Sequence, residues 1–481
     1  MRGAVNSGTN ALQGCFPAVR ARASPGPVTG LLCGQFHTDC LQSAADNSHF
    51  LTNHPARTVV LYLFFRIGDY QQPAGRKSNR RARDPHGDNW ADRSMNFFYI
   101  LTWVCVICLA YHYLGYPLVV YLISRLAPYT VKRDSIHPRV SLIVAAYNEA
   151  AVIKQKIDNS LALDYPRNLL EIIIVTDGSS DGTPDIVASY HDRGVMLMHQ
   201  RERAGKSAAI NRAAGKATGE ILVFSDANAF YRDDALRNLV RNFNDPSVGC
   251  VSGRKTVQAT SAAVTQSESS YWKYESFIKA CESRLGSTTA VVGEMMALRR
   301  EVFSPIPAGI INDDAYLAHH TLRSGYRVIY EPEAVCWETS AQSMHDEVIR
   351  RRRINAGRFQ LFFRFSLWPW NRPLAIFSLA SHKYMRLFLP VFMSGALLGN
   401  IAWVILAPEA GLLKWLLIAQ LIFYASAIIG WFGERFQLRW RIPALSYYIA
   451  RASLTPMEGL WGFLRRTQTT LWEKLDRGNP A

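Results

Sequence analysis

An apolar segment from Asn96 to Ala127 most strongly limits how this chain folds. It reads NFFYILTWVCVICLAYHYLGYPLVVYLISRLA, contains no acidic residue, and carries Arg125 as its one lysine or arginine. A helix that crosses a bilayer needs about 20 mainly apolar residues, and Trp103 and the tyrosines of the segment suit the two membrane interfaces. We therefore assign residues 95–127 to a transmembrane helix.

Further apolar runs lie in the C-terminal region, residues 366–481. Two of them, Met385–Leu406 and Leu412–Phe432, are long enough to span a bilayer. The last run, Ile442–Leu464, is interrupted by charged side chains and prolines, so it either spans the membrane or lies in the plane of its surface. We expect two or three transmembrane helices here, followed by a short tail.

Basic residues near the apolar runs predict how the chain is oriented. The loop 433–441 holds an excess of arginine, which favours the cytoplasm, whereas the loop 407–411 has no basic residue. The polar domain between the first two runs is then cytoplasmic, in a multi-pass protein of the cell membrane. A basic segment at 71–94 fits this orientation poorly.

Residues 1–94 do not read as a folded domain. They are rich in glycine, proline and polar residues, and their one apolar stretch, Thr58–Ile67, is too short to span a bilayer. Met95 stands directly before the first long apolar run. We expect either that Met95 is the true start or that the first 94 residues are a disordered extension.

The chain has a formal net charge of +16, which suits nucleic acid, anionic lipid or a phosphorylated substrate. Nucleic acid is disfavoured because the sequence has no zinc pattern and no interleaved aromatic and basic RNA motif. We expect membrane lipid as a partner and no nucleic acid. Cys105 and Cys108 form a Cys-x-x-Cys pair inside the first apolar run, where packing is favoured over metal binding.

Residues 128–365 alternate between apolar strands and helical patterns. A strand that begins at Arg139, a helix, and a strand that ends at Asp177 follow one another at the spacing of a βαβ unit, which predicts an α/β domain with a parallel start. Ligands of such sheets bind beyond the carboxyl ends of the strands. Asn148, Glu149 and Asp177 all fall at that edge.

Two later segments add a cation and an acid to this edge. The sequence around Lys206 resembles the end of a phosphate loop, but Gln200 stands where that loop needs its first glycine, so an ATPase or dinucleotide site loses support. Lys206 can still neutralise a diphosphate as a point charge. Another strand ends at Asp226, with Asn228 two residues on, and their oxygens suit Mg²⁺ or Mn²⁺.

Two adjacent acids, Asp313 and Asp314, open a helix further along the chain. One acid is enough for a cap or for the helix dipole. The pair therefore indicates a carboxylate that accepts a proton from an incoming hydroxyl group, although the two acids are chemically equivalent. We interpret His319 and His320 on the same helix as surface residues rather than metal ligands.

These motifs, taken in order, resemble glycosyltransferase family 2. They are VSLIVAAYNE, DGSSDGT, the Gly-Lys segment, SDAN and the acid pair, and they cover residues 139–360. The flanking membrane runs are similar to those of membrane-bound members such as poly-β-1,6-N-acetylglucosamine synthases and, more distantly, hyaluronan, chitin and cellulose synthases. The resemblance implies a GT-A-type nucleotide-sugar-binding domain at 128–365, with a mixed, mostly parallel sheet, flanked by transmembrane helices.

The resemblance also implies an activity and a donor site. A hexosyl or N-acetylhexosaminyl group would move from a nucleotide-diphosphate sugar, expected to be a UDP-sugar, to a polysaccharide, with inversion to a β-glycosidic bond. Asp177 would hold the nucleotide base, with Asn148 and Glu149 nearby. Lys206 would help to stabilise the leaving diphosphate.

The remaining site residues are assigned by the same resemblance. Asp226, helped by Asn228, would bind Mg²⁺ or Mn²⁺ on the diphosphate. Asp314, with Asp313 beside it, takes the position of the catalytic base. Gly293 and Glu294 would lie near the acceptor sugar.

One motif departs from the pattern of the polymer synthases. Their Gln-x-x-Arg-Trp is replaced here by Arg350-Arg-Arg-Arg353-Ile354, in which Arg353 alone matches. Loss of the tryptophan removes an aromatic platform for the acceptor, so a single transfer to a lipid-linked acceptor competes with polymer synthesis, and a non-catalytic nucleotide-sugar-binding protein is a third hypothesis. The surrounding run, Val348–Phe365, is either an interfacial helix on anionic lipid, a diphosphate-binding element, or both.

Overall fold

The computed structural model describes residues 87–258, 263–339, 344–407, 411–436, 438 and 440–467. Most of the N-terminal segment, and the C-terminal tail from residue 468, lie outside the described residues, so the expectation of an extension there stays untested. The first described helix begins at Gly87, which is earlier than Met95. The apolar run therefore marks the part of this helix that suits a membrane, and not the start of the helix itself.

One eight-stranded sheet forms the centre of the polar domain, in the order β3-β2-β1-β4-β7-β6-β8-β5. Strands β1 to β4 are parallel to one another, as are β6 and β8, whereas β7 runs antiparallel to both β4 and β6. The expected mixed, mostly parallel sheet is confirmed. The strands are β1 (Val140–Ala146), β2 (Leu170–Asp177), β3 (Val195–Gln200), β4 (Ile221–Asp226), β5 (Phe230–Tyr231), β6 (Val248–Gln258), β7 (Met296–Arg299) and β8 (Arg327–Thr339).

Helices cover the sheet because its strands are apolar on both faces, as parallel strands usually are. Ile153 and Ile157 of α5 are fully buried against one face, and Ala209 and Ile210 of α7 are buried against the other. The helices of this domain are α5 (Ala150–Leu161), α6 (Thr183–Ala188), α7 (Lys206–Lys216), α8 (Ala235–Val240), α9 (Ala263–Arg284), α10 (Asp313–Arg323) and α11 (Met344–Phe362).

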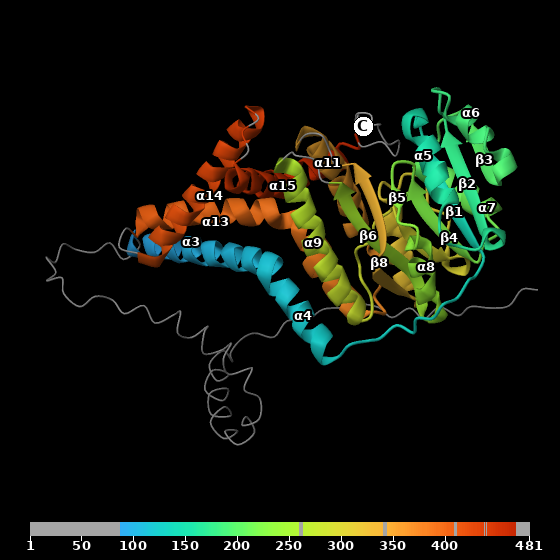
Figure 1. The fold of residues 1–481 in the computed structure, drawn as a ribbon. Helices are drawn as coiled ribbons and strands as arrows, with labels where there is room; N and C mark the ends of the chain where they lie inside the picture. The colour runs from blue at the N-terminus through green and yellow to red at the C-terminus, as the bar shows by residue number, and fades with distance from the viewer. Residues whose placement is uncertain are drawn as a thin grey trace, which may run out of the picture. The chain divides into compact units, whose positions relative to one another are not determined.

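The described part of the chain has three helical segments that are long and apolar enough to cross a membrane: Arg93–Leu126, Pro373–Leu406 and Gly411–Arg435. The first contains α3 and α4 with a π-helical turn between them, where Figure 1 shows the helix bending. The second contains α12 and α13, and α13 packs along α3. The helices are α3 (Gly87–Ala110), α4 (Tyr116–Leu126), α12 (Pro373–Ser378), α13 (Leu389–Leu406), α14 (Gly411–Arg435) and α15 (Arg441–Leu464).

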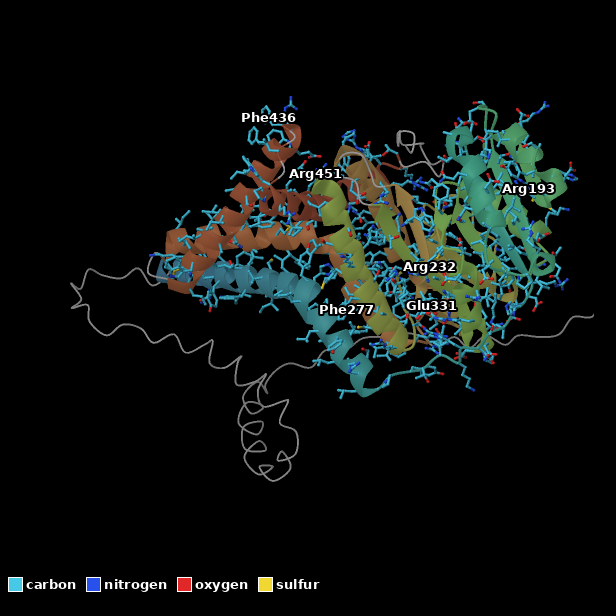
Figure 2. All side chains as sticks on the ribbon, in the orientation of Figure 1. Arg193, Arg232, Phe277, Glu331, Phe436 and Arg451 are labelled. Carbon is cyan, nitrogen blue, oxygen red and sulfur yellow. The ribbon has the colours of Figure 1, made fainter. Side chains whose placement is uncertain are left out.

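Helix α15 is not among these three segments. Its internal charges pair with each other, since Arg451 lies 2.7 Å from Glu458, and Figure 2 labels Arg451 on this helix. The helix packs against α11 and α14 rather than standing alone.

Helix α9 joins the sheet to the membrane helices. It packs against β6 and β8 on one side and against α4 and α15 on the other. Its Phe277, labelled in Figure 2, has its ring 5.8 Å from that of Tyr121 on α4. The deeper part of the joint is polar: the buried Glu282 accepts a hydrogen bond from Tyr116 (2.6 Å) and pairs with His382 (2.8 Å).

A second buried acid on α9, Glu275, strengthens this joint. Its carboxylate pairs with Lys383 at 2.5 Å, with Arg386 at 3.2 Å and with His382 at 3.3 Å. Although burial opposes it, these cations lower the pKa of Glu275 well below its usual range. Glu275 is therefore ionised, and α9 is tied to the second membrane segment by charge as well as by packing.

Helix α11 packs closely against its neighbours at two glycines, Gly357 on α11 and Gly459 on α15. A Cβ at Gly357 would collide with the side chain of Asn312, the residue before α10. A Cβ on Gly459 of α15 would lie 2.7 Å from the Cβ of Asn355 on α11. These contacts set α11 directly against the start of α10 on one side and against α15 on the other.

Gly219 gives a test of the packing of the sheet. A Cβ at this buried position would lie 2.5 Å from the backbone nitrogen of Ser141 on β1. We expect Gly219→Ala to lower the free energy of unfolding by about 1–3 kcal/mol, because the β1 backbone cannot move aside. Thermal unfolding of the full chain in detergent measures the effect.

Gly215 is the matched control for this prediction. It lies exposed in α7, and a Cβ at this position would meet no neighbouring group within 4 Å. Gly215→Ala is expected to raise stability by about 0.5–1 kcal/mol, because alanine loses less backbone entropy than glycine when a helix forms. Equal effects of the two substitutions would contradict the assigned packing.

Candidate active site

The carboxyl ends of β1 and β4 open onto a cavity of 770 Å³. Parallel strands bring their ends to one edge of a sheet, so residues far apart in sequence meet there. The predicted residues that line this cavity are Glu149, Lys206, Asp226, Asn228, Glu294, Asp314 and Arg353. Asn148, Asp177, Gly293 and Asp313 stand behind or beside that lining.

Lys206 is the centre of a charge cluster at this edge. Its ammonium lies 2.6 Å from an oxygen of Asp226 and 3.7 Å from an oxygen of Asp313. Burial alone would lower the pKa of Lys206, but the two carboxylates outweigh burial and raise it. Lys206 therefore stays cationic and joins the end of β4 to the start of α10.

Asp314, on the cavity wall in the first turn of α10, differs from its neighbour. Burial and, next, the negative charge of Asp313 raise the pKa of Asp314 to about 6. One oxygen of Asp314 accepts a hydrogen bond from the backbone N–H of Ala315 at 2.7 Å. Gly293 packs against this carboxyl, since a Cβ at Gly293 would lie 3.3 Å from the Cβ of Asp314. The carboxyl is thus held in place, with a pKa suited to taking up a proton near neutral pH.

Glu294 takes part in a different ion pair. Its carboxylate lies 2.5 Å from the ammonium of Lys255, a buried residue of β6. Burial opposes ionisation, but Lys255 lowers the pKa of Glu294 to about 2. Glu294 is therefore a fixed negative charge on the cavity wall and is unsuited to exchanging protons near neutral pH.

Asp177 ends β2 as expected, but its side chain is fully buried and points into the protein. Its oxygens accept hydrogen bonds from the backbone N–H groups of Ala204 (3.1 Å) and Gly205 (2.7 Å). In this structure Asp177 holds the loop that leads to Lys206. Its predicted contact with a nucleotide base stays a prediction.

Asn148 and Glu149 shape the neighbouring turn. Asn148 has a positive φ of 54°, and its side-chain oxygen accepts a hydrogen bond from the N–H of Ser180 at 2.8 Å. The N–H of Glu149 donates to Thr183 at 2.9 Å. These bonds tie the end of β1 to the turn after β2 and leave Glu149 on the cavity wall.

The donor set at Asp226 and Asn228 fits a divalent cation. Both residues line the cavity, and each has a side-chain oxygen that can bind a cation. The buried side-chain nitrogen of Asn228 has no hydrogen-bond partner among the described residues and can donate to a phosphate oxygen. No group of three or more His, Cys, Asp or Glu side chains gathers to hold a metal in the described part of the chain. One carboxylate and one amide leave positions open, as Mg²⁺ and Mn²⁺ sites that share substrate phosphates do.

Lys156 supports the site but was not among the residues predicted from the sequence. It is fully buried, and its ammonium binds the hydroxyl of Ser225 at 2.9 Å and the backbone carbonyl of Ala229. These contacts flank Asp226 on both sides and fix the turn that presents it. Helical periodicity could have indicated that Lys156 is buried, because it lies on the same inner face of α5 as Ile153 and Ile157.

The arginines of α11 do not all serve the same purpose. Arg350 lies 2.7 Å from Glu347 and 3.4 Å from Glu338, so it is neutralised within the protein. Arg353 donates to the carbonyl of Ile311 at 3.4 Å, beside the acid pair, and its buried Nε finds no partner among the described residues. Arg353 therefore lies close in space to the start of α10 and can still donate a hydrogen bond.

The interpretation of His319 as a surface residue is wrong. Its side chain is buried, with 3% of the residue exposed, and it lines the cavity. His319 lies on α10 on the same buried side as Leu322, whereas His320 is partly exposed. His319 was predicted to face solvent because histidine is polar, but a buried histidine can instead face a cavity.

Comparison with known proteins gives this cavity a context. Residues 137–356 match the model of Glycosyltransferase like family 2. The poly-beta-1,6-N-acetyl-D-glucosamine synthase of Staphylococcus aureus strain COL is 26% identical over 231 residues, which are 47% of this chain and 56% of that protein. The enzyme of the same name from Staphylococcus epidermidis is 25% identical over 238 residues, or 48% and 57%. The chain thus spans little more than half the length of these relatives.

A solved structure extends the likeness to the fold. The mannosyltransferase PcManGT from Pyrobaculum calidifontis, in complex with GDP-Man and Mn²⁺, superposes with a TM-score of 0.58 and 26% identity, covering 76% of this chain and 100% of that one. Residues 137–356 therefore form a glycosyltransferase family 2-like domain of GT-A fold, carried between helices that are long and apolar enough to cross a membrane.

Proposed function

We propose that this chain moves a sugar from a nucleotide-diphosphate sugar to a hydroxyl group of a glycan, with inversion at the anomeric carbon. The observation that supports this proposal is Asp314, a half-buried carboxyl on the wall of the cavity whose pKa is raised to about 6. The acceptor hydroxyl attacks the anomeric carbon and gives its proton to Asp314, and the bond from that carbon to the diphosphate oxygen breaks. Inversion follows because a single displacement takes place.

The charge cluster beside Asp314 supports the leaving group. A divalent ion held by Asp226 and Asn228 would supply Lewis-acid stabilisation of the diphosphate, and Lys206 adds a second positive charge from the protein. Asp313 keeps Lys206 in place. The solved relative was crystallised with GDP-Man and Mn²⁺, and a UDP-sugar is the donor we propose here because the curated relatives are named as N-acetylglucosamine polymer synthases.

The acceptor we propose first is a growing exopolysaccharide, by analogy with the same relatives. The catalytic domain would face the cytoplasm, where nucleotide sugars are made, since the arginine-rich loop after α14 favours that side. Lipid at the membrane surface would then contact α11 and α15.

A lipid-linked acceptor that receives one sugar is the second candidate. It is favoured by Ile354, which leaves no aromatic platform at this position, and by the arginines Arg351 and Arg358 on the same helix, which line the cavity. The length of the product distinguishes the two: a ladder of products indicates a polymer, and a single added sugar indicates the second candidate.

Replacing the proposed base tests the assignment directly. We expect Asp314→Asn to lower the rate of sugar transfer by about 10²- to 10⁴-fold, the usual contribution of a positioned proton acceptor. Asp313→Asn is the matched control on the same helical turn and should lose less, because Asp313 acts through Lys206. Transfer of radiolabelled sugar in membranes measures both. If Asp313→Asn proves the more damaging, the roles of the two acids are exchanged.

The raised pKa of Asp314 predicts the acid limb of the pH profile. A base must be unprotonated, so activity is present above pH 6 and is lost as the pH falls through the pKa of about 6. We expect kcat/KM to drop about tenfold per pH unit below that point. Asp313→Asn removes a neighbouring negative charge and should move the limb to lower pH. A limb that stays in place would show that Asp314 is not the titrating group.

Removal of the divalent ion tests the metal assignment. A chelator should stop nucleoside diphosphate release, and added Mn²⁺ should restore it. We expect Asp226→Asn to raise the Mn²⁺ concentration for half-maximal rate by roughly tenfold or more. Asp164→Asn, an exposed acid paired with Arg237, is the control and should not change it. Full activity in the chelator would remove the metal from the reaction.

A further inference from the structure

The cavity continues past the catalytic acids into a compartment with basic walls. We define this basic compartment by Arg351 and Arg358 of α11, Tyr384 and Arg386 of the second membrane segment, and His319 of α10, all of which line the same 770 Å³ cavity as Asp226 and Asp314. The walls therefore come from the catalytic domain on one side and from a candidate membrane span on the other.

Two of its arginines already form ion pairs within the protein. Arg351 lies 2.6 Å from Glu347, and Arg386 lies 3.2 Å from Glu275 and donates to the hydroxyl of Tyr271 at 2.8 Å. Their charges are partly neutralised, and their positions are fixed. They form a rigid, cationic frame rather than a set of mobile surface side chains.

Arg358 differs from these two arginines. Its hydrogen-bond partner is the amide oxygen of Asn355, at 3.0 Å, and no acidic side chain in the described ranges pairs with it. Burial and the nearby charge of Arg386 lower the pKa of Arg358. The acid that acts on Arg358 from nearby, Glu275, already pairs with Lys383 and Arg386. A guanidinium among cations that share one acid is stabilised when an anion enters beside it.

Two buried polar atoms on the same walls also lack partners. The hydroxyl of Tyr384 and Nδ1 of His319 have no hydrogen-bond partner among the described residues, although each residue is 3% exposed. Their rings lie 6.4 Å apart, edge to face. Buried polar groups nearly always find a partner. Both residues line the cavity, so their unpaired atoms indicate that a polar ligand completes them after a small movement of the side chains.

We propose that the basic compartment binds the phosphate group of a membrane-carried acceptor, while a sugar hydroxyl of the same acceptor reaches Asp314. The inference rests on the proposed function and specifies its second candidate. The phosphate does not react: Arg358 and Tyr384 bind its oxygens, and the transferred sugar goes to the hydroxyl alone. The phosphate joins the lipid chain to the sugar as a diester, so it carries one negative charge, which a planar guanidinium can bind through two N–H groups.

The position of the compartment indicates where this phosphate comes from. Tyr384 and Arg386 belong to the segment Pro373–Leu406, which is long and apolar enough to cross a membrane. Next to them, Phe388 is 38% exposed and Trp370 is 61% exposed. A lipid chain attached to the phosphate would run along this apolar surface, whereas a free phosphate would have no contact with it.

Binding of hexadecyl phosphate to the purified full chain in neutral detergent tests the proposal, with inorganic phosphate and neutral hexadecyl glucoside as comparison probes. Calorimetry should show hexadecyl phosphate binding more tightly than either. We expect Arg358→Gln and Tyr384→Phe each to weaken it by roughly tenfold or more. Tyr384→Phe keeps the ring and removes a hydroxyl that has no partner among the described residues, so it should leave thermal stability unchanged.

Arg364→Gln is the matched control, because Arg364 follows α11 on the exposed surface and does not line the cavity. It should bind all three probes as the wild type does. Affinity for a nucleoside diphosphate with Mn²⁺ should be unchanged in Arg358→Gln and Tyr384→Phe. Parallel loss of nucleotide affinity would assign the compartment to the donor and overturn the proposal, as would equal affinity for inorganic and hexadecyl phosphate.

The same variants separate this proposal from the proposed function. If sugar transfer is lost in Asp314→Asn but hexadecyl phosphate binds the wild type and both compartment variants equally, transfer stands and the phosphate site is wrong. If hexadecyl phosphate binding depends on Arg358 and Tyr384 but no nucleotide sugar is ever consumed, the phosphate site stands as a binding site and the transferase assignment fails.

Discussion

The rest of the structure depends on two buried acids of α9, Glu275 and Glu282, and on the side chains that bind them. Glu282 binds Tyr116 of the first membrane segment, and both acids bind His382 of the second. Breaking one partner of a buried ion pair costs about 3–5 kcal/mol, so these contacts resist separation. They fix the catalytic sheet relative to the membrane helices, and the cavity between them has a defined shape for that reason.

Charge is used differently on the two sides of that cavity. On the sheet side, Lys206 lies between Asp226 and Asp313, so a cation and two acids already balance before any substrate enters. On the membrane side, cations exceed the acids near them, with Arg358 as the clearest case. The first arrangement suits exchange of one cation for another, and the second suits capture of an anion.

Sequence motifs predicted the sheet, the membrane helices and the acids at the strand ends, because strand ends in a parallel sheet must meet. They did not reveal that Asp177 is turned inward to bind Ala204 and Gly205, since hydrogen bonds to a distant loop leave no local pattern. The burial of Lys156 could have been predicted from the helical periodicity of α5. His319 was misassigned, because burial against a membrane segment distant in sequence is not written in the residues around it.

The two glycine contacts of α11 have a consequence for modular exchange. At Gly357 the helix packs against the side chain of Asn312, and Gly459 of α15 packs against Asn355 and the backbone of α11. A pair of helices with the same charge and hydrophobicity, but with alanine at these two positions, could not pack this closely. A graft of the catalytic domain onto other membrane helices therefore needs glycine, or an equally small contact, at both positions, because α11 packs against the start of α10 on one side and against α15 on the other.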